Sequence, residues 1–229
     1  ETTSLDSMAA QIVGISFAVK QGEAAYVPLA HNYGDAPAQL PLTAVLSQLK
    51  PWLEDERAAK VGQHIKYDTH VFANHGIAVR GYVHDTLLQS YVLEAHLPHS
   101  LERLADRHLG RKGLSYEDVC GKGAHQIPFA QVDVQKATEY SGEDSEMTLG
   151  VHEALWPQLK ADANFRDLSA KLVDTEDHLQ YARRFYNGAV KQYRDRLESF
   201  PHVIVASAFG FQPLPFFETD EREAVKVQL

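Results

Sequence analysis

The sequence of 229 residues has very little cysteine and no long apolar segment. Its one cysteine, Cys120, cannot form an internal disulfide, which suits a reducing compartment, and we expect a cytoplasmic protein. No run of residues approaches the roughly 20 apolar residues that span a bilayer. The first residues are acidic or carry hydroxyl groups, where a secretory signal would be basic. We therefore expect neither a membrane span nor a signal peptide.

The chain also has fewer positive than negative charges. The chain has 22 Lys and Arg against 31 Asp and Glu, a net charge of −9, whereas a general nucleic-acid-binding domain carries a basic stripe. A nuclease that binds a strand end through metal ions is still compatible with this charge, because carboxylate ligands make such a site acidic. Some basic residues do gather in one region, and either a phosphate track or a solvated surface would explain them: Arg103, Arg107, Arg111, Lys112 and Lys122.

Strand and helix patterns alternate along residues 1–157. The apolar runs Ile12 to Val19 and Ala24 to Leu29 flank a short polar turn, which predicts a β-hairpin. Apolar residues at helical spacing predict helices at 42–53, 67–75, 87–95, 101–109 and 116–120, with extended segments at 60–65 and 77–83. Strands followed by helices interleaved with short strands predict an α/β fold with a mixed sheet.

A candidate site begins with two residues one helical turn apart. Apolar positions across 133–155 are spaced as on a helix, so Tyr140 and Asp144 share one face. A carboxylate that holds a divalent cation, beside a phenol that orients water, suits metal-assisted hydrolysis. The pattern Tyr-x-x-x-Asp also recurs by chance, so it needs support from elsewhere in the chain.

Two other stretches supply that support: Glu1-Thr2-Thr3-Ser4-Leu5-Asp6 and Gly62-Gln63-His64-Ile65-Lys66-Tyr67-Asp68. Together with the stretch around Tyr140, residues 1–157 resemble the 3′–5′ exonuclease (proofreading) domain of bacterial DNA polymerase I. That domain is a member of the DnaQ-like, ribonuclease H-like superfamily. The likeness continues through residues 13–18, 49–55 and 121–123.

The resemblance implies a fold and an activity. The fold is a ribonuclease H-like mixed sheet with flanking helices, and the activity is hydrolysis of single-stranded DNA 3′ ends to nucleoside 5′-monophosphates. Two divalent cations, Mg²⁺ or Mn²⁺ with Zn²⁺ as an alternative, would be held by Glu1, Asp68 and Asp144. Tyr140 would orient the attacking water, so the implied catalytic residues are Glu1, Asp68, Tyr140 and Asp144.

The resemblance also implies substrate contacts. Leu5 matches a leucine that wedges between the terminal bases, and Tyr116 matches an aromatic residue that packs on the last nucleotide. Gln63 and His64 occupy substrate-binding positions, although many relatives have Asn where this chain has His64. A polymerase domain is the family's expected partner.

One departure from the family pattern concerns the first motif. The family has Asp-x-Glu there, and this chain begins at the Glu. The missing Asp bridges both metal ions in the family and lies on the first strand, which is truncated here. We therefore expect low or no exonuclease activity.

A second pattern occupies residues 158–229. Apolar residues step by three and four from Phe165 to Phe200, which predicts one long helix over 160–200. The helix should stop at Pro201, since proline cannot continue the hydrogen-bond ladder. Several stretches resemble the C-terminal half of the LemA family of small helical membrane-anchored proteins: 174–177, 182–187, 198–201, 209–211 and 216–218.

Two interpretations of the whole chain stay open. The two resemblances meet within residues 155–160, as in a natural fusion or an artefact. The chain is either a metal-dependent exonuclease or a non-catalytic, LemA-like interaction or membrane-periphery protein that carries an inactive nuclease scaffold. The partner of the LemA-like segment is not indicated by its residues.

Overall fold

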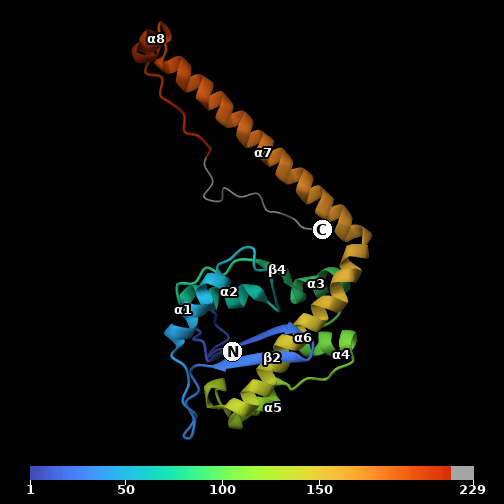
Figure 1. The fold of residues 1–229 in the computed structure, drawn as a ribbon. Helices are drawn as coiled ribbons and strands as arrows, with labels where there is room; N and C mark the ends of the chain where they lie inside the picture. Colours follow the sequence, from blue (N-terminus) through green and yellow to red (C-terminus); the bar gives the residue numbers. More distant parts are fainter. Residues whose placement is uncertain (218–229) are drawn as a thin grey trace. The chain divides into compact units, whose positions relative to one another are not determined.

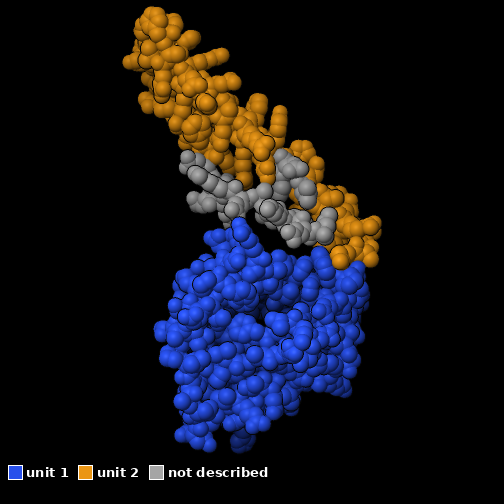
Figure 2. All heavy atoms as spheres, in the orientation of Figure 1, with its two compact units in different colours: residues 1–159 blue, residues 160–229 orange. Residues whose placement is uncertain are grey.

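The computed structural model describes residues 1–217, apart from the side chains of residues 173, 176 and 177. The predicted LemA-like segment therefore lies in part outside the described residues, from residue 218 onward. By their internal contacts the residues form two compact units, 1–159 and 160–229, coloured separately in Figure 2. Each unit is described by itself.

The predicted hairpin is present in unit 1 (Figure 1). Strands β1 (Gly14–Lys20) and β2 (Glu23–Pro28) pair antiparallel, from Gly14 opposite Pro28 to Lys20 opposite Glu23. Gly14 is required where β1 begins, because a Cβ atom there would lie 2.1 Å from the hydroxyl oxygen of Tyr26. Just before the hairpin, Thr2 forms an isolated antiparallel bridge with Ile12, so the first residues run beside the entry to β1.

A second pair of strands is parallel. β3 (Lys60–Gly62) and β4 (Tyr82–Asp85) are joined by α2 (Ile65–Asn74), as a parallel connection requires. The α/β class and the presence of both pairing directions agree with the prediction. Among the described residues, however, the strands form two separate two-stranded ladders.

Five further helices of unit 1 follow the predicted pattern. They are α1 (Leu42–Leu53), α3 (Thr86–Glu94), α4 (Leu101–Leu109), α5 (Tyr116–Cys120) and α6 (Val134–Ala161). Short 3₁₀ turns at Gly123–His125 and Phe129–Gln131 lie between α5 and α6. The hairpin contributes to two apolar clusters: Ile15 packs with residues of α1 and α2, whereas Tyr26 packs with residues of α5 and α6. Cys120 is buried in the second cluster, so it is a core cysteine.

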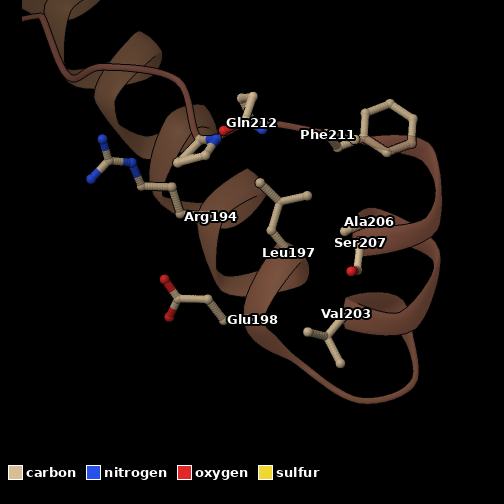
Figure 3. A pocket seen from close by; sticks show the side chains of 10 residues that line it. Arg194, Leu197, Glu198, Val203, Ala206, Ser207, Phe211 and Gln212 are labelled. Atoms are coloured by element: carbon tan, nitrogen blue, oxygen red, sulfur yellow. The ribbon is translucent and has the colours of Figure 1, made fainter.

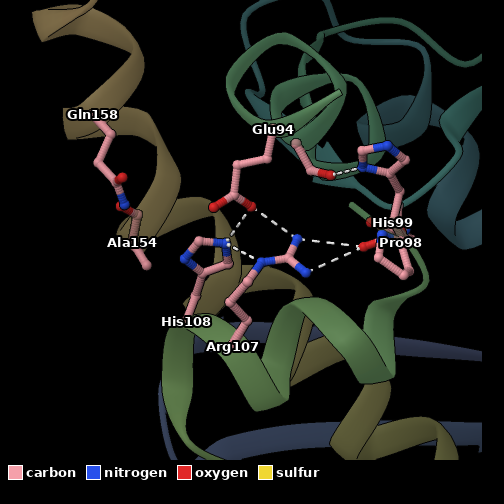
Figure 4. A network of polar contacts seen from close by, with 9 residues as sticks. Glu94, Pro98, His99, Arg107, His108, Ala154 and Gln158 are labelled. Carbon is pink, nitrogen blue, oxygen red and sulfur yellow. Dashed lines mark hydrogen bonds and ion pairs between the residues drawn. The ribbon is translucent and has the colours of Figure 1, made fainter. Parts of the chain in front are cut away.

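A polar network fixes the corner between α3 and α4 (Figure 4). The Glu94 carboxylate accepts from Arg107 at 2.8 Å and from His108 at 3.1 Å, and the Arg107 guanidinium also donates to the Pro98 carbonyl at 3.3 Å. His99, in the same loop, is hydrogen-bonded to Ser90 of α3. The loop between the two helices is therefore anchored at both ends.

Unit 2 contains the predicted long helix. α7 (Ala163–Glu198) is continuous, begins at an Asp162 cap that accepts from the Phe165 amide at 2.7 Å, and ends before Pro201. α8 (His202–Phe209) follows, and residues 211–217 return along α7. The return is held by the Leu214 carbonyl, which accepts from Arg194 at 2.9 Å, and by Asn187, whose side chain accepts from the Phe217 amide at 2.8 Å. None of the helices in residues 1–217 is long and apolar enough to cross a membrane.

Candidate active site

Glu1 is held between the hairpin and α2. Its carbonyl accepts from the Val13 amide at 2.8 Å, and its terminal ammonium donates to the Gly14 carbonyl at 2.8 Å. From α2, the Tyr67 hydroxyl is hydrogen-bonded to the Ser4 carbonyl and to the Thr2 hydroxyl. These bonds fix the first residues beside the helix that carries Asp68.

Asp68 lies in the first turn of α2, whose start is set by a residue distant in sequence. The buried Asp85 carboxylate, at the end of β4, accepts from the amides of His64 and Ile65, each at 3.0 Å. The same carboxylate accepts from the Leu87 amide at 2.9 Å, so Asp85 is also the cap of α3. Because Asp85 caps α2 as well, this helix begins two residues before the predicted start.

The environment of Asp68 disfavours its charged form. Burial raises the pKa of Asp68 to about 6, the terminal ammonium opposes that rise, and the charges of Glu1 and Asp85 add to it. The terminal ammonium therefore places positive charge beside a predicted cation ligand.

Tyr140 and Asp144 lie one turn apart on α6, so their side chains project from the same face of the helix. Burial raises the pKa of Asp144 to about 7, with the negative charge of Glu1 as the next contribution. Burial and the Asp144 charge also raise the pKa of Tyr140, so its hydroxyl stays protonated at neutral pH. The predicted pairing of a phenol and a carboxylate on one helical face is confirmed.

The start of α6 is tied to the hairpin by a buried histidine. His31 is bonded to the Tyr26 hydroxyl at 2.8 Å and, through Nδ1, to the Val132 carbonyl at 2.9 Å. Since a carbonyl only accepts, Nδ1 of His31 donates and Nε2 accepts from Tyr26. Burial lowers the pKa of His31, in keeping with this neutral form. The helix that carries Tyr140 is thereby fixed to the strand pair beside Glu1.

Glu1 connects the two parts of the candidate site. Its charge raises the pKa of Asp68 on α2 and the pKa of Asp144 on α6, so both carboxyl groups lie within its electrostatic reach. Across residues 1–217, no Lys or Arg side chain forms an ion pair with any of these three carboxylates. Glu1, Asp68 and Asp144 thus come from three separate elements, and within the described residues no neighbouring Lys or Arg side chain neutralises them.

The fit to a metal ion can be judged from this donor set. Carboxylate oxygens are the ligands that hard divalent cations prefer, and uncompensated negative charge favours a cation. In the part of the chain that the structure describes, no three His, Cys, Asp or Glu side chains lie close enough together to hold an ion as they stand. The chemistry of the donors fits a divalent cation, whereas residues 1–217 contain no preformed cage for one.

The residues predicted to contact the substrate differ in how far their side chains are exposed and free of hydrogen bonds within the protein. Leu5 is 99% exposed, and Tyr116 is 39% exposed with its ring parallel to that of Phe129. His64 is exposed, in the left-handed region at φ 60°, and stacked on Tyr67. The side chain of Gln63 is already hydrogen-bonded within the protein, because its amide donates to the His99 carbonyl at 3.0 Å and accepts from Thr86.

The basic residues of this region are mostly neutralised. Arg107 is paired with Glu94, Arg111 with Glu146 at 2.6 Å, and Lys122 with Glu117 at 3.0 Å. Ion pairs of this kind favour the interpretation as a solvated surface over a phosphate track.

Two family models match the chain. Residues 1–160 match the model described as 3′–5′ exonuclease, and residues 129–229 match that of the LemA family. The matches overlap across residues 129–160, which hold most of α6.

The curated relatives include bacterial DNA polymerases. The chain is 49% identical over 195 residues to DNA polymerase I of Pseudomonas aeruginosa, a match that covers 83% of the chain and 21% of the relative. It is 39% identical over 179 residues to DNA polymerase I of Rhizobium leguminosarum, covering 70% and 18%. The chain thus spans about a fifth of these relatives' length. Because the match to the Pseudomonas aeruginosa polymerase covers 83% of the chain, it extends past residue 160. It therefore reaches residues that the LemA model matches and the exonuclease model does not.

Solved structures show the fold. Brucella melitensis NrnC superposes with a TM-score of 0.53 at 17% identity, covering 73% of this chain and 74% of that one, and it has also been solved with bound Mg²⁺ and bound to pGG. The Pol1 structure from M. smegmatis has a TM-score of 0.52 at 17% identity, covering 92% of this chain and 36% of that one. With the ribonuclease H-like fold and the family match over residues 1–160, the chain belongs to the 3′–5′ exonuclease family represented in bacterial DNA polymerase I.

Proposed function

We propose that unit 1 is a metal-dependent 3′–5′ exonuclease that acts on single-stranded DNA 3′ ends and releases nucleoside 5′-monophosphates. The observation that carries the proposal is that burial, with the charge of Glu1 adding to it, raises the pKa of Asp68 to about 6 and that of Asp144 to about 7. Carboxyl groups in this state are poised to exchange protons for a divalent cation near neutral pH.

Glu1, Asp68 and Asp144 would hold the cations, Mg²⁺ or Mn²⁺ with Zn²⁺ as an alternative. A bound cation would make hydroxide available near neutral pH and stabilise the leaving oxygen. The Mg²⁺ and pGG in the NrnC structures support both the cation and an oligonucleotide substrate. A polymerase domain like that of the curated relatives is the proposed partner in the complete protein.

The chain's own side chains would position the substrate. The protonated hydroxyl of Tyr140, one helical turn from Asp144, would orient the attacking water. Exposed Leu5 and Tyr116 would pack on the last bases, and His64, which projects from the start of α2, would contact the same end of the strand. Gln63 would support that end by holding the loop at His99.

The polypeptide that begins at Glu1 should have little activity. The family's first-motif Asp is not supplied by it, and the ammonium on Gly14 places positive charge beside Asp68. A short N-terminal extension ending in Asp-Thr would supply the carboxylate and replace the ammonium with a neutral amide.

The test compares both polypeptides on single-stranded DNA labelled so that released nucleotides are counted, with Mn²⁺ or Mg²⁺ present. We expect metal-dependent release from the extended chain, little from the shorter one, and a loss of at least about a hundredfold in the extended Asp144→Ala variant. Equal rates from both chains would show that the first-motif Asp is dispensable.

No release from an extended chain that is folded and binds Mn²⁺ would favour the second candidate function. That candidate is a LemA-like interaction or membrane-periphery protein, and the match of residues 129–229 to the LemA family supports it.

A further inference from the structure

The end of unit 2 carries a long stretch without charge. Residues 199–217 contain no Asp, Glu, Lys or Arg. They include α8 and the residues on either side of it, at the end of α7 that lies away from Ala163 (Figure 1). We use the term apolar tip for Phe200, Val203, Ile204, Val205, Phe209 and Phe211.

The apolar tip is exposed to solvent. Phe200 is 81% exposed, Ile204 60% and Phe209 76%, whereas Ala206 is the one residue of α8 that is buried. The inner side of α8 faces a pocket of about 350 Å³ shared with the end of α7, into which Val203 and Ser207 point (Figure 3). Exposed apolar side chains that gather in one place ordinarily mark a surface that a partner covers, so a partner is expected here.

The distribution of the exposed side chains indicates the kind of partner. Val203, Ile204 and Val205 are consecutive and all at least 40% exposed. Consecutive helical residues point in directions about 100° apart, so the exposure runs around α8. A protein groove accepts one helical face, with anchors three and four residues apart. A fluid apolar phase covers all faces, as the interior of a lipid layer does.

The charges beside the apolar tip indicate the sign of the charge on the surface that it would bind. Over residues 183–198 of α7, five basic residues stand against two acidic ones: Arg183, Arg184, Lys191, Arg194 and Arg196 against Asp195 and Glu198. Lys191 and Arg196 are exposed, which leaves them able to meet phosphate groups. Basic side chains beside inserted apolar ones are the pattern of proteins that bind an anionic membrane surface.

We propose that the apolar tip inserts into the surface of an anionic lipid bilayer, with the basic residues of α7 at the level of the headgroups. α8 has 8 residues, a length of about 12 Å, which suits shallow insertion and not a crossing. This interaction is independent of the proposed nuclease chemistry in unit 1.

The test is partition of the full chain onto vesicles, measured by co-sedimentation. Vesicles of phosphatidylcholine with phosphatidylglycerol should bind the chain, and pure phosphatidylcholine should bind it more weakly. Ile204→Ser with Phe209→Ser should lower the partition constant roughly tenfold or more. Lys191→Glu with Arg196→Glu should lower it by about fivefold or more per residue, only on the charged vesicles.

The matched control is Tyr181→Ser with Phe185→Ser, which removes side chains 69% and 71% exposed on α7 outside the apolar tip. This variant should bind like the parent chain. Phe209→Trp adds a fluorophore whose emission should shift to the blue on vesicles. Equal partition of the tip variant and the parent would overturn the proposal. A dimer in the absence of lipid that the tip variant abolishes, with no vesicle binding, would instead identify a second copy as the partner.

Discussion

At the scale of single residues, Asp85 has the most far-reaching contacts. Its carboxylate caps two helices at once, through His64 and Ile65 of α2 and through Leu87 of α3. His64 adopts a left-handed conformation, which a histidine reaches only at some cost, and in doing so it turns its amide towards Asp85. The position of Asp68 in the first turn therefore depends on Asp85.

We expect Asp85→Asn to destabilise unit 1 by about 1.5–3 kcal/mol, because the new amide cannot accept from both α2 amides and Leu87. Urea unfolding measures the loss, and hydrogen exchange should quicken at the amides of His64 and Ile65. Glu54→Gln is the control, since Glu54 also accepts a backbone amide, that of Ala78 at 3.0 Å, at a solvent-exposed position. Unchanged exchange at both α2 amides would contradict the role given to Asp85.

The residue scale also shows what the sequence can predict. The position of Tyr140 and Asp144 on one face of α6 follows from helical periodicity alone, so it was predictable. The second cap by Asp85 joins residues 20 and 21 positions apart, and no local pattern indicates such a contact. The hydrogen bond from Gln63 to the His99 carbonyl could not be predicted for the same reason, since it also joins residues far apart in sequence.

At the scale of elements, α6 and β4 meet through two stacked histidines. The rings of His84 on β4 and His152 on α6 lie 4.4 Å apart, and His152 also bonds to Gln89 at 2.9 Å. Burial, and next the charge of His84, lower the pKa of His152 to about 4. The folded state thus keeps this imidazole neutral under conditions where an unfolded chain would protonate it.

This difference gives a pH dependence with a defined sign. The unfolded His152 takes up its proton near pH 6.5 and the folded one near pH 4, so stability is complete above pH 6.5 and is lost as the pH falls between these values. We expect His152→Gln to reduce the drop in unfolding free energy between pH 7 and pH 4.5. Urea titrations at the two pH values measure it, with His70→Gln, an exposed position on α2, as the control. A drop as large in His152→Gln as in the parent would exclude this contribution.

Element boundaries followed the sequence where the signals are local. The ranges of α1, α4 and α5 agree with the apolar periodicity, helped by Gly110, which ends α4 at φ 63°, and by the Ser115 capping box of α5. The extended segment expected at 77–83 pairs only from Tyr82 onward, because its register is set by β3 and not by its own residues.

At the scale of the whole molecule, burial disfavours the charged forms of Asp68 and Asp144, and a bound cation would offset that cost. A raised carboxyl pKa means that the protonated form suits the folded state, so without metal this contribution is largest at low pH and is lost as the pH rises through about 6 and about 7. These two carboxyl groups thus lower stability near neutral pH.

We expect Mn²⁺ to raise the melting temperature of unit 1 at pH 7.5 and to have little effect at pH 5, where the carboxyl groups hold protons. At a hundred times its dissociation constant, the ion would add about 2.7 kcal/mol. Calorimetry at both pH values measures the shift. Asp68→Asn with Asp144→Asn should melt higher than the parent without metal and show no further rise with it. An equal rise in this variant would place the ion elsewhere.

The organisation of the chain into a nuclease-like part and a helical part was only partly predictable from the sequence. One long helix over 163–198 follows from a single apolar stripe, and it is present. The three carboxylates come from elements far apart in sequence, so family resemblance suggested their association and periodicity did not. Their roles as ligands stay a prediction, and so does the junction between the two resemblances.

The hydrogen bond from the Glu1 amine to Gly14 has a practical consequence for any polypeptide prepared with Glu1 as its first residue. A purification tag, an acetyl group or an amine-reactive dye would turn that ammonium into an amide, which still donates to the same carbonyl but carries no charge. Since the ammonium holds down the pKa of Asp68, samples with identical side chains but different amino termini would titrate differently. The state of the amino terminus is therefore a chemical variable to be matched whenever two samples of this chain are compared.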